Sequence, residues 1–190
     1  GLTRSPERSR ERFLKPDEIK VFIEAVNAEN ELWRCYFLTL LHTGQRRSAV
    51  AAMHWSDLDL SNGIWTLPSW DSKNGRTLTI ALTNDSMNLL AELKLSAIND
   101  YVFASTASTT GHIVNPNKAW KRICDRAGIE DLRLHDLRRT VGSYLAAAGA
   151  SNFVISKALG HSDLRSAQVY ARLDVEPVRT ALEGISGSLK

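Results

Sequence analysis

Residues 135–170 of the chain gather four side chains of the kinds that act on phosphate esters: His135, Arg138, His161 and Tyr170. A guanidinium binds a phosphate through two parallel hydrogen bonds, and an imidazole donates or accepts a proton near neutral pH. A phenol can serve as a covalent nucleophile. Together these residue types predict chemistry on a phosphodiester, with a tyrosine as the attacking group.

His135 and Arg138 also have a local setting that suits an anion. They lie three residues apart at the start of a predicted helix, so they share one face of its first turn. The free N–H groups and the positive dipole of a helix start attract a negative charge. The spacing alone is weak evidence, because Asp136 can be a simple cap and His135 a loop residue. By themselves, His161 and Tyr170 have equally plain structural interpretations, as a cap-region histidine and a core tyrosine.

Two further basic side chains come from the first half of the chain. Arg46 follows Thr43-Gly44, where a glycine able to adopt the left-handed cap ends a predicted helix. Lys73 precedes Asn74-Gly75, and Asn-Gly between two strands is the strongest short signal for a hairpin. The alternatives are that Arg46 belongs to a solvated basic pair and that Lys73 is a solubilising turn residue.

Taken in order, these features resemble the signature of the tyrosine recombinases, and in particular the catalytic domain of phage-type integrases. The motifs are Thr-Gly-x-Arg at 43–46, a hairpin lysine, His-x-x-Arg at 135–138, Gly-His at 160–161 and a following tyrosine. The resemblance extends over about residues 13–182. Its two C-terminal motifs are specific, whereas turn lysines are common.

The resemblance implies one catalytic site with six contributing side chains. Two arginines clamp the phosphate, a hairpin lysine and two imidazoles support proton transfer, and a tyrosine attacks; these are Arg46 and Arg138, Lys73, His135 and His161, and Tyr170. The product is a 3′-phosphotyrosyl link, which a 5′-hydroxyl of a partner strand reverses. Such a site requires no metal and no other cofactor.

Position 49 departs from the pattern of the family. Many of its members carry an acidic residue three positions after the first arginine, and this chain has Ala49 there. That carboxylate usually supports the site without touching the substrate. We therefore expect its replacement to affect the reaction rate and the rigidity of the site more than the type of reaction.

Composition sets wider limits on the fold and on the partners. The chain has 190 residues, 43% of them apolar, which suits one domain with a core. A net charge of +3 permits binding to nucleic acid without requiring it. Cys35 and Cys124 form no CxxC pair, which disfavours a disulfide framework or a cysteine zinc site. With no long apolar run or secretion signal evident, we expect a protein of the cytoplasm, and the resemblance implies that it is bacterial or phage-encoded.

Apolar periodicity predicts a mainly α-helical fold with a small antiparallel β-sheet, an α+β class that the resemblance also implies. We expect helices over about 16–26, 32–42, 45–54, 84–95, 116–127, 136–148, 152–159, 162–173 and 177–182, and strands over 64–67 and 77–82. We divide the chain into a tail or linker remnant at 1–12, a catalytic domain at 13–183 and a C-terminal tail at 184–190.

The resemblance also predicts the partners. They are double-stranded DNA attachment sites and three further copies of the protein in a tetramer on that DNA, with a monomer in solution and no membrane. It leads us to expect that the chain is a fragment without the N-terminal DNA-clamping domain of these enzymes. Three alternatives remain: a type IB topoisomerase with a similar site, a non-catalytic DNA-binding relative, and a metallohydrolase using His135 and His161. The metallohydrolase lacks a third ligand at suitable spacing.

Overall fold

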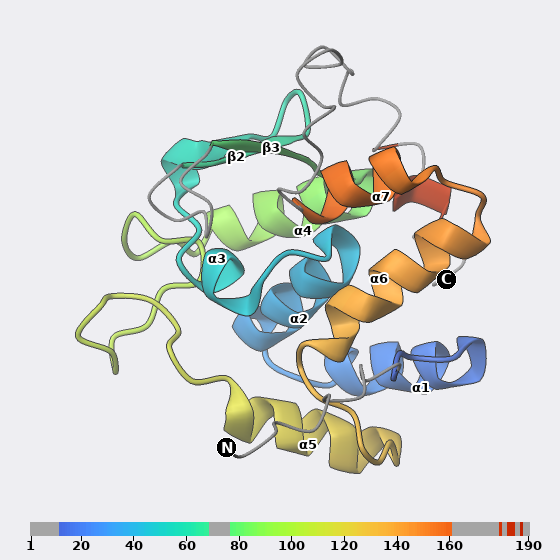
Figure 1. Ribbon diagram of the computed structural model, residues 1–190. Helices are drawn as coiled ribbons and strands as arrows, with labels where there is room; N and C mark the ends of the chain where they lie inside the picture. Colours follow the sequence, from blue (N-terminus) through green and yellow to red (C-terminus); the bar gives the residue numbers. More distant parts are fainter. Residues whose placement is uncertain (1–11, 69–76, 161–178, 180–181, 185–186, 188–190) are drawn as a thin grey trace, which may run out of the picture.

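A computed structural model of the chain describes residues 12–68, 77–160, 179, 182–184 and 187 (Figure 1). Lys73, His161 and Tyr170 lie outside the described residues, as do most of the two helices expected after residue 161. The described chain is mainly helical with one small antiparallel sheet, so the predicted fold class is confirmed. The helices are α1 (Pro16–Asn27), α2 (Glu31–Thr43), α3 (Arg47–Ala51), α4 (Asn84–Lys94), α5 (Asn117–Ala127), α6 (Asp136–Ala147), α7 (Asn152–Leu159) and the 3-10 turn η1 (Trp55–Asp57).

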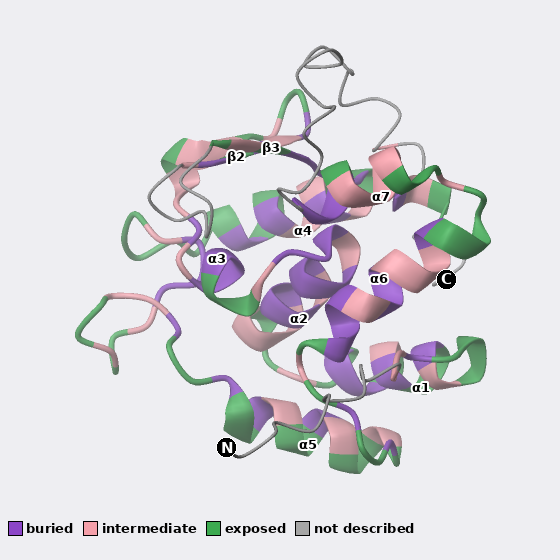
Figure 2. Cartoon of the chain, viewed as in Figure 1, coloured by how far each residue is buried: buried purple, intermediate pink, exposed green. Residues whose placement is uncertain are grey.

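The helix α2 lies at the centre of the fold and packs against α1, α3, α4 and α6. Its apolar side chains belong to the main core, and Figure 2 colours most of this helix as buried or intermediate. Tyr36 and Phe37 are fully buried and pack edge to face, with ring centroids 5.2 Å apart. Large buried aromatic rings contribute much of the hydrophobic stabilisation of a domain of this size. The central helix is thus fixed firmly, and the chain segment that leaves its C-terminal end starts from a rigid point.

The sheet has the order β1-β2-β3, with β1 (Leu58–Asp59), β2 (Ile64–Leu67) and β3 (Leu78–Ala81) all antiparallel. In the β2–β3 pair, Ile64 lies opposite Ala81 and Leu67 opposite Leu78. Both of these strands were predicted, and their connection at 69–76 lies outside the described residues. The strand β1 was not predicted, because two residues are too few to show an alternating pattern.

Several helix ends follow the local signals in the sequence. The Thr83 side chain accepts a hydrogen bond from the Ser86 amide at 3.2 Å, and Ser151 accepts one from Val154 at 3.3 Å. These are standard N-terminal caps. Three glycines adopt the left-handed conformation just after a helix: Gly44, where this was predicted, Gly128 and Gly160.

Two expectations about the elements were wrong in detail. The helix expected over 45–54 is only the short α3, because His54 has an extended backbone and forms a β-bridge with Tyr101. The helix α4 ends at Lys94, so Leu95 lies beyond it and is 91% exposed rather than part of the apolar face. For the helix expected over 45–54, a bridge to a distant segment ends a pattern that continues locally.

Leu182, in the segment expected to form the last helix, is buried with Val141, Leu145 and Leu159 in a second, smaller apolar cluster. At this residue the C-terminal segment thus packs on its own domain. None of the helices that the model describes is long and apolar enough to cross a membrane.

Gly44 and Gly128 provide a matched pair for testing how tightly the end of α2 is packed. Their φ angles are +63° and +64°, but a Cβ at Gly44 would lie 2.7 Å from Leu159 Cδ2, whereas a Cβ at Gly128 would meet nothing within 4 Å. Left-handed strain alone should lower the free energy of unfolding of Gly128→Ala by about 1 kcal/mol. Gly44→Ala adds the cost of overpacking and should lose about 2–4 kcal/mol in urea denaturation. Equal losses in the two variants would contradict the close approach of α7.

Candidate active site

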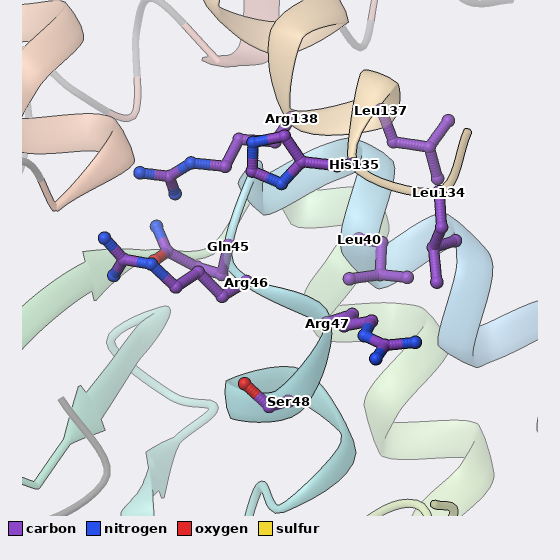
Figure 3. Close-up of a pocket in the computed structure, with 9 residues that line it drawn as sticks. All are labelled: Leu40, Gln45, Arg46, Arg47, Ser48, Leu134, His135, Leu137 and Arg138. Carbon is purple, nitrogen blue, oxygen red and sulfur yellow. The ribbon is translucent and has the colours of Figure 1, made fainter. Parts of the chain in front are cut away.

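Three of the six predicted site residues line one pocket. Arg46 comes from the link between α2 and α3, and His135 and Arg138 come from the start of α6. The pocket has a volume of about 350 Å³. Among the described residues, its lining is basic, polar and apolar without a carboxylate, and comprises Leu40, Gln45, Arg46, Arg47, Ser48, Leu134, His135, Leu137 and Arg138 (Figure 3). Segments almost a hundred residues apart in sequence therefore meet at this pocket.

Arg46 is placed by the turn that follows α2. Gly44 ends α2 in the left-handed conformation, and Arg46 then takes an extended backbone as the residue before α3. The buried Tyr36 hydroxyl donates a hydrogen bond to the Arg47 carbonyl at 3.2 Å, which fixes the start of α3. Among the described residues, no ion pair engages Arg46. Its half-buried charge is thus available at the pocket.

Arg138 is held more tightly than a surface arginine. It is only 6% exposed, and its Nη1 donates a hydrogen bond to the Gly44 carbonyl at 2.7 Å. Its Nη2 donates to the Leu159 carbonyl. These carbonyls lie at the C-terminal ends of α2 and α7, where helix dipoles place partial negative charge. The buried guanidinium is therefore stabilised by two helix ends, and its orientation is set before any substrate binds.

The two arginines repel one another. Burial, and after it the charge of Arg46, lower the pKa of Arg138 to about 10, so its guanidinium stays protonated at neutral pH. Figure 3 shows both side chains extending in the same direction, whereas Arg47 points away from them. Two neighbouring cations, with no acidic residue among the described residues of the lining, form a site that favours an anion. A phosphate matches the fork geometry of both guanidinium groups.

His135 occupies the N-cap position of α6, with its exposed ring beside Arg138 (Figure 3). Partial burial, followed by the charges of Arg139 and Arg138, lowers the pKa of His135 below its ordinary value. A larger fraction of the imidazole is consequently neutral near pH 7. A neutral imidazole at this place can accept a proton from a nucleophile.

The buried Asp136 supports this segment without lining the pocket. Its Oδ2 accepts a hydrogen bond from the Arg133 amide and its Oδ1 one from Arg139 Nη1, each at 2.8 Å. The first bond closes the turn before α6 and so helps to fix His135. The carboxylate is thus a structural element of the turn, in line with the simpler interpretation of this residue as a cap.

The structure also adds a residue that sequence reasoning missed. Gln45 is 3% exposed, lines the pocket next to Arg46 and donates a hydrogen bond to the Ala158 carbonyl at 2.7 Å. The x of the Thr-Gly-x-Arg motif gave no indication of such a role. Ala49, where the family often has an acid, is buried in α3 and brings no charge to the site.

No cluster of three or more potential metal ligands occurs within the part of the chain that the model describes. The positions of Lys73, His161 and Tyr170 relative to the pocket lie outside that part. Their assignment stays a prediction from the sequence.

Comparison with known proteins identifies the family. The model of the phage integrase family matches residues 12–176. Among curated proteins, the chain is 29% identical to the integrase of Salmonella phage P22 over 179 residues, covering 88% of this chain and 45% of that protein. It is 28% identical to the prophage integrase IntF of Escherichia coli K12, covering 84% of this chain and 34% of that protein. The chain thus spans less than half the length of these two relatives.

Solved structures agree with the fold. The integrase from mycobacterium phage Brujita superposes with a TM-score of 0.76 at 18% identity, covering 98% of this chain and 60% of that one. The XerA recombinase gives a TM-score of 0.65 at 24% identity, covering 97% of this chain and 66% of that one. These likenesses confirm the mainly helical architecture with its small sheet.

The lowered pKa of His135 predicts how stability changes with pH. Below about pH 6.5, the ordinary pKa, the unfolded chain binds a proton at this residue before the folded chain does. The free energy of unfolding of the wild type should therefore fall on acidification from about pH 7.5 to 5.5 more than that of His135→Gln. Urea denaturation at both pH values measures this difference. If the difference in the free energy of unfolding between the wild type and the variant is the same at both pH values, the lowered pKa of His135 is contradicted.

Proposed function

Because the chain belongs to the phage integrase family, we propose that it is the catalytic domain of a DNA strand transferase that cleaves and rejoins DNA at specific sites. Curated relatives named as integrases, as a shufflon-specific DNA recombinase and as XerA tyrosine recombinases support this activity. Their names favour recombination over relaxation by a topoisomerase. The basic pocket supports a phosphodiester as the substrate.

The observation that carries the proposal is the convergence of Arg46 and Arg138 on one pocket, whose described lining residues include no carboxylate. In-line attack on phosphorus places negative charge on the non-bridging oxygens. Two preorganised guanidinium groups can bind those oxygens, each contributing roughly 3–4 kcal/mol if it behaves like other preorganised donors. A scissile phosphate therefore supplies the negative charge that the pocket lacks.

Proton transfers complete the mechanism. A phenol has a pKa of about 10, so the Tyr170 hydroxyl must lose its proton as it attacks, and we assign His135 as the acceptor. The new bond joins the phenolic oxygen to phosphorus while the bond to the 5′-oxygen breaks. Lys73 would protonate that oxygen, and His161 would donate a hydrogen bond to the phosphate. The resulting 3′-phosphotyrosyl link is reversed when a 5′-hydroxyl attacks it, so no water or cofactor is consumed.

We further propose double-stranded DNA attachment sites as partners, within the cytoplasm of a bacterium that carries the phage or prophage. Solved neighbours at the level of fold include XerH bound to its difH substrate and a lambda integrase dimer bound to a core site. The proposed assembly is a tetramer on DNA and a monomer in its absence. We place the catalytic domain at residues 13–183; the hydrogen bond from the Leu14 amide to Thr140 Oγ1 at 2.9 Å supports a start near residue 13.

The nucleophile is tested with a nicked suicide duplex that carries a candidate attachment site. Wild-type protein should form a covalent protein–DNA adduct, and mass spectrometry should find the modified peptide containing Tyr170. Tyr170→Phe should bind the duplex with the same affinity and form no adduct, because it lacks the attacking oxygen. Adduct formation by this variant would reject the assignment.

The proton donor is tested with a bridging sulfur. Lys73→Ala should cleave the ordinary duplex at least about 100-fold more slowly, which is the usual contribution of a general acid. Replacing the 5′-bridging oxygen with sulfur should remove most of this defect, since a thiolate leaves without a proton. A defect of the same size on both substrates would remove Lys73 from the acid role.

A further inference from the structure

Gln45 connects the loop that carries Arg46 to the far end of α7. Its Nε2 donates hydrogen bonds to the Ala158 carbonyl at 2.7 Å and to the Thr43 carbonyl at 3.3 Å. The residue is 3% exposed, so these bonds are shielded from water. In such surroundings an amide group without a hydrogen-bond partner is energetically unfavourable, and the buried side chain has little freedom to form a different hydrogen bond.

The same two segments are joined a second time by Arg138. Its guanidinium bridges the carbonyls of Gly44 and Leu159, which are the direct neighbours of Gln45 and Ala158. The α2–α3 link and the end of α7 are therefore fixed to each other by two adjacent side-chain bridges, one neutral and one charged. Only the charged bridge belongs to the predicted catalytic set.

The end of α7 is also closely packed. A Cβ at Gly160 would lie 2.8 Å from Leu78 Cδ1 of β3 and 3.7 Å from the Oε1 of Gln45. The backbone of Gly160 thus lies between β3 and the Gln45 amide. The next residue in the chain is His161. The close packing of Gly160 against Leu78 and Gln45 therefore fixes the point from which the chain continues to His161.

We propose that Gln45 is a positioning residue, which fixes the Arg46 loop relative to the end of α7 and thereby aligns the two arginines with the chain that continues to His161. This inference rests on the proposed function. Ala49 gives it a physical reason, because no carboxylate among the described residues lines the pocket to orient the arginines. An amide provides rigid support without neutralising the charge that the phosphate needs.

Two variants of Gln45 test the proposal by single-turnover cleavage of the nicked duplex at saturating protein. Gln45→Met keeps the length of the side chain and removes the amide; Gln45→Leu also removes the amide, with a shorter apolar side chain, and neither variant adds a charge to the pocket. Each should lower the cleavage rate constant by about 10- to 100-fold, the range expected when reacting groups are misplaced by up to 1 Å. The protein concentration for half-maximal DNA binding should not change. If one variant fails to fold, the other decides.

Hydrogen exchange provides a readout independent of catalysis. Peptides covering residues 152–160 should exchange faster in Gln45→Met than in the wild type, because the end of α7 loses one of its two bridges. Thr83→Ala is the matched control, since it removes a buried capping side chain of α4 outside the pocket. This control should change neither exchange in 152–160 nor the cleavage rate.

The outcomes distinguish a failure of the proposed function from a failure of the positioning role of Gln45. A wild-type protein that forms no adduct contradicts the proposed function. If the wild type cleaves and both Gln45 variants cleave equally fast, the proposed function stands and the positioning role is rejected. Unchanged exchange in residues 152–160 also rejects it, and so does a slowing of cleavage by Thr83→Ala that matches the slowing by Gln45→Met.

Discussion

The site depends on the burial of one guanidinium between the C-terminal ends of two helices. Arg138 donates to the carbonyls of Gly44 and Leu159, so the directions of α2, α6 and α7 are linked at a single charged group. Removing a charge from water is unfavourable unless hydrogen bonds and opposite charge compensate it. Here carbonyls and helix dipoles provide that compensation, and they hold the guanidinium in one orientation at the pocket.

The use of carbonyls rather than carboxylates has a consequence for catalysis. A carboxylate beside the arginines would neutralise them and compete with the substrate. Ala49 brings no charge, and the carboxylate of Asp136 is engaged by Arg133 and Arg139 outside the pocket lining. In the proposed function, the negative charge of a phosphate complements the described lining of the pocket, and its binding would relieve the repulsion between Arg46 and Arg138.

Much of this arrangement could be predicted from short sequence signals. The caps at Thr83 and Ser151 are local, and the resemblance brought Arg46 together with the pair at 135–138. The burial of Arg138 and the role of Gln45 could not be predicted, because both depend on carbonyls of α7 that approach only in the folded chain. The early end of the helix after Arg46 likewise depends on a bridge between His54 and Tyr101.

The most direct test is to remove the negative charge of the scissile phosphate in the substrate. The rate of adduct formation should be measured for wild type, Arg46→Ala and Arg138→Ala on a duplex with the natural scissile phosphate and on one with a neutral methylphosphonate at that position. Arg126→Ala, which loses an ion pair to Glu29 remote from the pocket, serves as the control. If the arginines act by matching the phosphate charge, their replacement should cost much less on the neutral substrate. Equal losses on both substrates would contradict the claim that the two arginines clamp one phosphate.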